Sequence, residues 1–331
     1  MVSRRDFLVL PCLCAVGLPQ VAGAQGASRM RRIGFLGARS PSTPSKPDVY
    51  YDAFVKGMRE LGYVEGQNIA IEWRFADGKY DRLPELAADL VRSNVEVIVT
   101  HSTPGTREAQ RATRVIPIVT AASLDAIASG FSTNLSKPSS NITGLTLMVM
   151  DLTPKQLELT RLMVPGLARV GLLVNPGNTA HPKFHASLRA AGRGAGIDVF
   201  TVEARTVDEI VRAFAEAESQ GIQAVVIAAD SFFIGQRRLI AEAAIKGRIL
   251  SMSSYREDVE AGCLISYGQN TAEFYRRAAR YVDKLLKGAK PADLPIEQPT
   301  NIHLALNRNT ARLLGLSIPN ELLLRADELL D

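Results

Sequence analysis

Two apolar runs in this chain each end in small polar residues whose types suit the binding of a small ion. The run 95–100 continues into the stretch HSTPGT at 101–106, and the run 223–229 continues into Asp230 and Ser231. This pattern is typical of a buried strand, a tight loop and a helix start, where free backbone N–H groups attract anions. Ligands of open parallel sheets lie at the carboxyl ends of the strands. We therefore predict two such strand ends facing one ligand.

The elements that must position these residues alternate between strands and helices. A first unit has expected strands at 32–37, 68–75, 95–99 and 116–120, with helices at 49–61, 83–91 and 107–114. After an extended connector at 141–146, a second unit repeats the pattern, with expected strands at 169–174, 197–202, 223–229 and 249–251. Its helices are expected at 154–163, up to 191, at 207–217 and at 236–244. Such alternation predicts an α/β fold of two Rossmann-like lobes with mainly parallel sheets.

The C-terminal segment does not begin a third unit. It contains one long expected helix at 273–287, one strand at 302–306 and two short helices that flank 317–319. One helix and one strand cannot bury their own faces, so they must complete the two lobes. The chain then crosses between the lobes near 143–146, 266–268 and 295–301, which makes a three-crossing hinge that can close on a ligand. The expected boundaries are 29–145 plus 269–296 for lobe 1 and 146–268 plus 297–331 for lobe 2.

The N-terminus has the pattern of a signal peptide over residues 1–24. Arg4 and Arg5 precede an apolar run, and the sequence Ala-Gly-Ala ending at Ala24 fits a cleavage site. The stretch SRRDFL resembles the twin-arginine export signal, with an ordinary Sec signal as the alternative. Both routes lead out of the cytoplasm. No small residue precedes Cys12 or Cys14, which argues against a lipid anchor.

Composition and cysteine use narrow the function classes. The net charge of +5 is modest and the basic residues are scattered along the sequence, so we expect no basic surface that binds nucleic acid. After signal removal only Cys263 remains, which excludes an internal disulfide. Its strand-like surroundings predict a buried and unreactive thiol. The 46% hydrophobic residues suffice for substantial cores.

The sequence contains no complete catalytic or metal-binding motif. The sequence has no Gly-x-Ser-x-Gly elbow and no Gly-Lys-Ser/Thr phosphate loop, and the Gly-rich stretch 192–196 precedes a strand where a dinucleotide site would follow one. His181 and His185 have i, i+4 spacing, but no third ligand is evident, so a surface pair is expected. His101 next to Ser102 suggests a hydrolase, yet adjacent side chains at a strand end tend to diverge. No enzyme, metal or cofactor is predicted.

Several separate stretches resemble the ABC-transporter substrate-binding protein family that includes tryptophan/tyrosine-type amino-acid receptors. They are ELGYVEGQNI at 60–69, YDRLPELA at 80–87, ISYG at 265–268 and LKGAKPADLP at 286–295. The resemblance covers nearly the whole mature chain. It implies a periplasmic-binding-protein type I fold, a small-molecule ligand in the interlobe cleft, an ABC permease of the inner membrane as partner, and a periplasmic location. A monomer is expected.

The same resemblance implies that the ligand contacts lie at the strand ends. Ser102, Thr103 and the backbone around Gly105 suit a carboxylate, and Asp230 suits an amino group, although each of these side chains could simply cap a helix. The predicted ligand-binding residues are Ser40, Ser42, Ser102, Thr103, Thr106, Ser123 and Asp125 in lobe 1, Asn175, Asn178, Thr179, Asp230, Ser231, Ser254 and Tyr255 in lobe 2, and Tyr267 at the second crossing.

Two departures from the family pattern bear on the ligand. Relatives commonly have Gly-Asp-Pro where this chain has SLDA at 123–126, and the first connector continues as LMVM at 147–150. These changes predict a more apolar cleft and a small carboxylate with an apolar or aromatic body. A ligand-binding partner of a membrane sensor, or a secreted α/β hydrolase, are the alternative functions.

Overall fold

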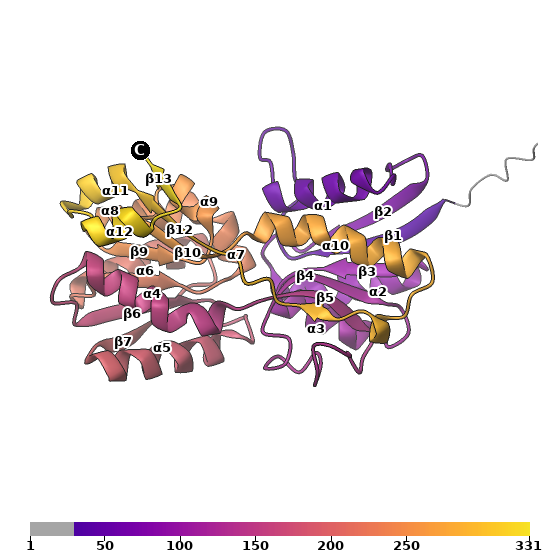
Figure 1. Ribbon diagram of the computed structural model, residues 1–331, viewed down its shortest axis with the longest axis horizontal. Coiled ribbons are helices and arrows are strands. Elements are labelled where there is room, and N and C mark those ends of the chain that lie inside the picture. Colours follow the sequence, from indigo (N-terminus) through magenta and orange to yellow (C-terminus); the bar gives the residue numbers. More distant parts are fainter. Residues whose placement is uncertain (1–29) are drawn as a thin grey trace, which may run out of the picture.

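Two α/β lobes lie side by side in the computed structural model, which describes residues 30–331 (Figure 1). The predicted signal peptide at 1–24 lies outside these residues. Each lobe has one sheet with helices on both faces, which confirms the predicted fold class. Within the described chain, no helix combines the length and apolarity needed to cross a bilayer.

The lobe 1 sheet has six strands, all paired in parallel, in the order β11-β5-β4-β3-β1-β2. Its strands are β1 (Arg31–Gly37), β2 (Ile69–Phe75), β3 (Val97–Thr100), β4 (Ile118–Leu124), β5 (Ile142–Leu147) and β11 (Ile296–Glu297). Its helices are α1 (Val49–Glu60), α2 (Leu83–Arg92), α3 (Thr103–Ala112) and α10 (Thr271–Leu286), with short 3-10 turns η1 (Tyr80–Arg82) and η2 (Pro291–Asp293).

The lobe 2 sheet has seven strands in the order β13-β12-β10-β9-β8-β6-β7, and only β10 and β12 pair antiparallel. Its strands are β6 (Arg169–Val174), β7 (Asp198–Glu203), β8 (Ala224–Ile227), β9 (Leu250–Ser253), β10 (Ile265–Gln269), β12 (Ile302–Asn307) and β13 (Glu328–Leu330). Its helices are α4 (Val149–Met163), α5 (His181–Ala195), α6 (Val207–Ser219), α7 (Ser231–Gly235), α8 (Arg237–Lys246), α9 (Arg256–Glu260), α11 (Arg308–Leu314) and α12 (Asn320–Arg325).

Helix α10 explains how the C-terminal segment completes lobe 1. It packs against α1 among the N-terminal elements (Figure 1). Gly57 of α1 allows the close approach, because a Cβ atom there would lie 2.4 Å from the Arg276 carbonyl oxygen. The face of α10 that meets lobe 1 buries Phe274, Tyr275 and Val282. Burial of this face accounts for the position of a helix that could not fold alone.

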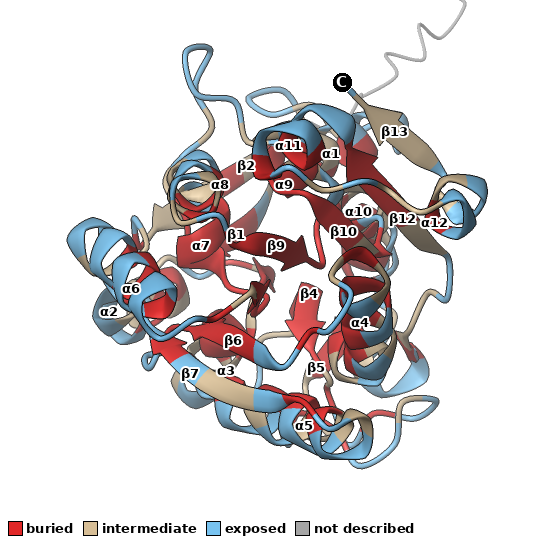
Figure 2. Ribbon diagram, turned by 90° about the vertical axis from the view of Figure 1, so that its left-hand side faces the viewer, coloured by how far each residue is buried: buried red, intermediate tan, exposed pale blue. Residues whose placement is uncertain are grey.

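Burial separates the strands from the outer helix faces. Figure 2, seen from the side of lobe 2, shows strands β6, β9 and β10 buried and the outer faces of α5, α6 and α12 exposed. In lobe 1, β4 is buried along its whole length. Strands buried on both faces are typical of parallel sheets covered by helices, and they explain the continuous apolar runs of the sequence.

Some element predictions were wrong. The stretch 141–146, expected as a connector, contains most of β5, which pairs with β4 and buries all of its residues. The first crossing therefore comes after Leu147. Helix α4 begins at Val149, before Pro154, and α3 begins at Thr103. The short elements α7, α9 and β13 were not predicted, because three to five residues carry no measurable periodicity.

One side chain ties together the three crossings between the lobes. The crossings lie between β5 and α4, between β10 and α10, and between β11 and β12. Gln269, buried at the second crossing, accepts a hydrogen bond from the Met148 N–H at 2.8 Å through its Oε1. Its Nε2 donates to the Pro299 carbonyl. The amide of Gln269 thus links all three hinge segments.

Candidate functional site

A cavity of about 20 Å³ lies between the lobes, where the carboxyl ends of β3 and β4 face those of β6 and β8. We call it the interlobe cavity. Its volume is sufficient for little more than one water molecule in the arrangement of the lobes described. Lobe 1 and its α10 helix line it with Arg39, His101, Ser102, Thr103, Ala122, Leu124, Leu147, Thr271 and Tyr275, and lobe 2 with Asn178, Ala229, Asp230, Ser231, Ile234 and Tyr255.

The structure brings part of the predicted site together around this cavity. Ser102, Thr103, Asn178, Asp230, Ser231 and Tyr255 all line it. They come from both lobes, as two facing strand ends require. Ser40 lies just outside, in a second and larger pocket described below.

The remaining predicted residues do not line the cavity, and most serve the local structure. Thr106 donates to the Ser102 carbonyl oxygen at 2.8 Å, and Asp125 accepts from the Ala128 N–H at 2.9 Å. Thr179 is exposed. Ser42 Oγ accepts a hydrogen bond from the Asp48 N–H, and the Asn175 side chain donates one to Asp230. The Gln156 side chain donates to Ser254 Oγ and to the Tyr267 carbonyl oxygen. Ser123 Oγ is buried and has no hydrogen-bond partner within residues 30–331.

Arg39, which the sequence did not single out, is the cation of the interlobe cavity. It lies in the loop between β1 and α1 and is only 5% exposed. Asp48 binds it through two contacts, Nε to Oδ2 at 2.7 Å and Nη2 to Oδ1 at 3.0 Å. The rings of Tyr50, Tyr51 and Tyr275 surround the guanidinium, with centroids 5.0, 4.6 and 5.7 Å from Cζ. A buried cation needs this kind of compensation.

Asp48 is a second site residue that the sequence did not single out, and it also has an ordinary structural role. Its Oδ1 caps α1 by accepting from the N–H groups of Tyr50 and Tyr51. Burial acts to raise the pKa of Asp48, but the charge and hydrogen bonds of Arg39 outweigh it and hold the pKa below the usual value. Asp48 is therefore ionised at neutral pH. It contacts Nε and Nη2 of Arg39, and the remaining nitrogen, Nη1, is directed to the cavity wall, where it donates to Tyr275 Oη at 3.3 Å.

His101 is a buried structural histidine. Its Nε2 accepts from the Ala38 N–H at 3.0 Å and lies 3.0 Å from Tyr51 Oη. Burial and then the Arg39 charge lower the pKa of His101 well below its usual value, so the ring is neutral. Ser102 Oγ instead accepts from the Gly105 N–H as the cap of α3. No hydrogen bond joins His101 to Ser102 in the described chain, so this pair has no nucleophile–base geometry.

The backbone of Ser102 is strained where it meets the cavity. Its φ of 65° lies in the left-handed region, which a residue other than glycine adopts at a cost of about 1–3 kcal/mol. The Ser102 N–H compensates by donating to the Ala122 carbonyl oxygen at 2.9 Å. This conformation presents the N-terminus of α3 to the cavity, which favours a negatively charged ligand group.

Asp230 is the acidic group of the cavity, and protein donors already occupy it. Its Oδ2 accepts from Tyr80 Oη at 2.8 Å and from Asn178 Nδ2 at 2.9 Å, and its Oδ1 accepts from the Phe232 N–H at 2.8 Å. Asp230 thus caps α7, the alternative that the sequence left open. A ligand ammonium would have to compete with these donors. Because Tyr80 belongs to lobe 1, its hydroxyl also links the two lobes.

His181 is not the surface residue that the i, i+4 pattern predicted. It is 2% exposed, its Nδ1 accepts from the Asn175 N–H at 2.9 Å, and its Nε2 lies 3.3 Å from the Ala229 carbonyl oxygen. Phe233 stacks on its ring at 6.4 Å. His185 is on the helix surface and contacts Thr201. Within residues 30–331, no group of three or more His, Cys, Asp or Glu side chains could hold a metal ion.

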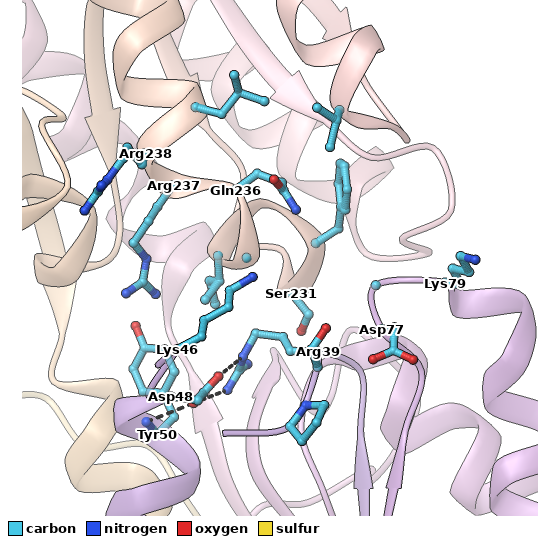
Figure 3. Close-up of a pocket in the computed structure, with 18 of the residues that line it drawn as sticks. Arg39, Lys46, Asp48, Tyr50, Asp77, Lys79, Ser231, Gln236, Arg237 and Arg238 are labelled. Atoms are coloured by element: carbon cyan, nitrogen blue, oxygen red, sulfur yellow. Dashed lines mark hydrogen bonds and ion pairs between the residues drawn. The ribbon is translucent and has the colours of Figure 1, made fainter. Parts of the chain in front are cut away.

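A second and much larger pocket opens next to the interlobe cavity (Figure 3). This outer pocket has a volume of about 920 Å³ and lies between the loop before α1 in lobe 1 and the α7–α8 segment of lobe 2. Arg39 and Ser231 line both spaces, so the two are continuous. The charged residues of the outer pocket are Arg39, Lys46, Asp48, Asp77, Lys79, Arg205, Arg237, Arg238 and Glu242.

Apolar side chains line both spaces. In the interlobe cavity they are Ala122, Leu124, Leu147, Ala229 and Ile234. In the outer pocket they are Pro41, Pro47, Val49, Val207, Phe232, Ile234 and Leu239. Of the apolar stretch 147–150, only Leu147 lines the cavity. Cys263 is buried away from both spaces, and burial raises the pKa of its thiol. The unreactive thiol expected from the sequence agrees with this environment.

A family model and a named relative each match most of this chain. A family model described as ABC transporter substrate binding protein matches residues 42–330. A protein of Clostridioides difficile (strain R20291) named tyrosine-binding protein is 23% identical over 279 residues, which cover 83% of this chain and 80% of that protein.

Solved structures show the same fold. An ABC domain from Streptococcus pneumonia in complex with L-Trp has a TM-score of 0.81 and 24% identity, over 91% of this chain and 99% of that one. A conserved domain protein from Vibrio cholerae has a TM-score of 0.83 and 22% identity, over 91% of this chain and all of that one (100%).

Proposed function

Since this chain belongs to the family of ABC transporter substrate-binding proteins, we propose that it is the extracytoplasmic receptor of an ABC importer. It works in the periplasm after export, cleaved near Ala24, and delivers its ligand to an ABC permease of the inner membrane. Two lobes joined by three crossings, with a polar cavity at their contact, support a receptor that closes on its ligand.

The ligand in this proposal is a small carboxylate, either an amino acid or an aromatic or apolar acid. The observation that supports it best is the buried guanidinium of Arg39 at the cavity wall, beside Ser102 and Thr103 at the N-terminus of α3. A charge-assisted hydrogen bond from Arg and the positive end of a helix both favour a carboxylate. One relative is named for tyrosine and another was solved in complex with L-Trp, and both of these amino acids carry a carboxylate.

Ligand entry requires the lobes to separate. The interlobe cavity of about 20 Å³ cannot admit an amino acid in the arrangement described. Several hydrogen bonds join the lobes across the cleft. Among them are those from Tyr80 Oη to Asp230 Oδ2 and from Tyr50 Oη to Glu257 Oε2, each 2.8 Å long, and the one from the Ser231 N–H to Tyr80 Oη at 3.2 Å. The closed form is thus partly stabilised by the protein itself, and the ligand adds contacts to both lobes.

Calorimetric titration of Arg39 variants tests the ligand class. A panel of L-amino acids and aromatic acids, with their neutral amides, identifies the carboxylate that binds best. The double substitution Arg39→Met with Asp48→Asn should weaken its binding about 10- to 150-fold, which corresponds to the loss of about 1.5–3 kcal/mol from a hydrogen bond to a charged group. Removal of both partners leaves no unpaired buried charge.

Asp48→Asn alone is the matched control. It removes the ion-pair partner of Arg39 and should lower the stability, but it keeps the Arg39 cation, and an asparagine can still cap α1, so the carboxylate should still bind. Melting temperatures of both variants verify that the fold persists. A wild-type preference for a cation or a neutral sugar would contradict the proposal, and so would equal binding of the acid and its amide.

A further inference from the structure

The outer pocket, more than the interlobe cavity, has the size of a ligand site. Its volume of about 920 Å³ falls in the range of about 300–1,000 Å³ that small-molecule sites occupy, whereas the interlobe cavity has about 20 Å³. Arg39 and Ser231 line both spaces. With the lobes as described, a ligand whose acid group contacts Arg39 can place the rest of its body only in the outer pocket.

The lining of the outer pocket has an excess of positive charge. Its acids Asp48 and Asp77 are paired, the first with Arg39 and the second with Arg82, leaving Glu242 as the remaining carboxylate. Four of its cations form no ion pair within residues 30–331. They are Lys46, Lys79, Arg205 and Arg238.

Two cations from opposite lobes point into the space between them (Figure 3). Lys46 extends from the loop before α1, and Arg237 extends from the first turn of α8 toward lobe 1, with its guanidinium 5.9 Å from the Tyr50 ring centroid. The carboxylate of Asp258 lies 3.4 Å from Arg237 Nε without forming a hydrogen bond. Arg237 therefore retains donors for another anion. Lys79 and Arg238 lie at the rim and point away.

We propose that the outer pocket is a second anion subsite, so that the ligand is an elongated molecule with two acidic groups. This inference rests on the proposed function, because the first acidic group is the carboxylate at Arg39. The second group, a carboxylate or another oxyanion, lies between Lys46 and Arg237 and so contacts both lobes. A dianion of this kind stabilises closure through each of its ends.

Three matched probes test the second subsite by calorimetric titration. They are 3-(4-carboxyphenyl)propionate, its carbamoyl analogue 3-(4-carbamoylphenyl)propionate, and 3-phenylpropionate. The first two have nearly the same size and differ in the second charge. We expect the wild-type protein to bind the diacid at least about tenfold more tightly than the carbamoyl analogue. Lys46→Gln and Arg237→Gln should each reduce this ratio, and the double variant should bring it close to one.

Arg312→Gln is the matched control, because Arg312 is an exposed arginine on α11, outside both spaces, and the ratio should remain at its wild-type value. Equal wild-type affinities for the diacid and the carbamoyl analogue would overturn the second subsite while leaving the carboxylate site at Arg39 intact. A ratio that survives the double substitution would overturn it as well. Failure of all three probes to bind would also overturn the second subsite, whereas the proposed carboxylate receptor would be contradicted only if no acid of the amino-acid and aromatic-acid panel bound.

Discussion

At the residue scale, the site depends on how a buried charge is compensated. Arg39 has a carboxylate, three aromatic rings and a phenol oxygen around it, and these partners come from residues 48 to 275. Such an environment orients the guanidinium before any ligand arrives, which reduces the entropy lost on binding. Arg39 therefore resembles a preformed anchor more than a surface cation.

Asp258 is a second buried charge near the cleft, and it should make stability depend on pH. Burial raises the pKa of Asp258 to about 6, although the Arg237 charge and the Ser253 hydroxyl act in the opposite direction and Glu257 adds to the rise. In the unfolded chain the pKa is about 4. Between these values the folded protein binds more protons than the unfolded chain. The free energy of unfolding therefore falls as the pH rises from about 4 to about 6.

Asp258→Asn should remove this contribution. We expect the fall in unfolding free energy between pH 4 and pH 6 to be smaller in the variant by about 2–3 kcal/mol, since each pKa unit corresponds to about 1.4 kcal/mol. Urea unfolding at pH 4, 5, 6 and 7 measures the difference between the two proteins. Parallel pH curves would show that Asp258 is ionised in the folded state throughout this range.

At the element scale, the contact between α1 and α10 holds the site in place. Tyr50 and Tyr51 belong to α1 and Tyr275 to α10, and all three surround Arg39. Tyr50 and Tyr275 stack with their centroids 5.4 Å apart. Any change in the spacing of these helices would therefore move the guanidinium.

Gly57→Ala tests this spacing. The added methyl group would lie 2.4 Å from the Arg276 carbonyl oxygen and 3.0 Å from Ala279 Cβ, so the helices must move apart. We expect a loss of about 1–3 kcal/mol in unfolding free energy by chemical denaturation, together with weaker ligand binding. The control is Gly194→Ala in α5, where a Cβ meets nothing within 4 Å and alanine should stabilise the helix by about 0.5–1 kcal/mol. Equal stability changes in the two variants would contradict the close-packing argument.

At the scale of the whole molecule, the balance between open and closed forms depends on a few contacts between the lobes. Gln269 links the three hinge segments through its side-chain amide. Across the cleft, Tyr80 links η1 of lobe 1 to Asp230 and to the Ser231 N–H of lobe 2. In the proposed function the ligand binds between the lobes, so we expect these contacts to contribute to its apparent affinity.

Tyr80→Phe should destabilise the closed form. It removes both hydrogen bonds of the Tyr80 hydroxyl to lobe 2, with Asp230 and with the Ser231 N–H, which together are worth about 1–3 kcal/mol, and leaves Asp230 with its other donors. Affinity for the best carboxylate should fall about five- to 150-fold in calorimetric titration. Tyr63→Phe is the control, because its hydroxyl bonds Asp283 within lobe 1 at 3.0 Å and its loss should leave the affinity unchanged. Equal affinities of the two variants would mean that the Tyr80 contact does not influence closure.

The sequence by itself determined the α/β class, the two units and the strand ends that meet at the interlobe cavity. These features were predictable because strand and helix periodicity depend on residues that are close in the chain. Thus the ends of β3 and β8 were located, and Ser102, Thr103, Asp230 and Ser231 do line one cavity. Short elements such as α7 and β13 escaped, since they hold their conformation through neighbours from elsewhere.

Only the tertiary structure decided which charges and rings meet at the site. Arg39 and Tyr275 are 236 positions apart, and Tyr80 and Asp230 are 150 apart, yet each pair is in hydrogen-bond contact. His181 became a core residue for the same reason, because Ala229, 48 positions away, and Phe233 pack against it. Compensation of a buried charge or polar group depends on groups brought close by packing, and no local pattern along the chain encodes which groups those are.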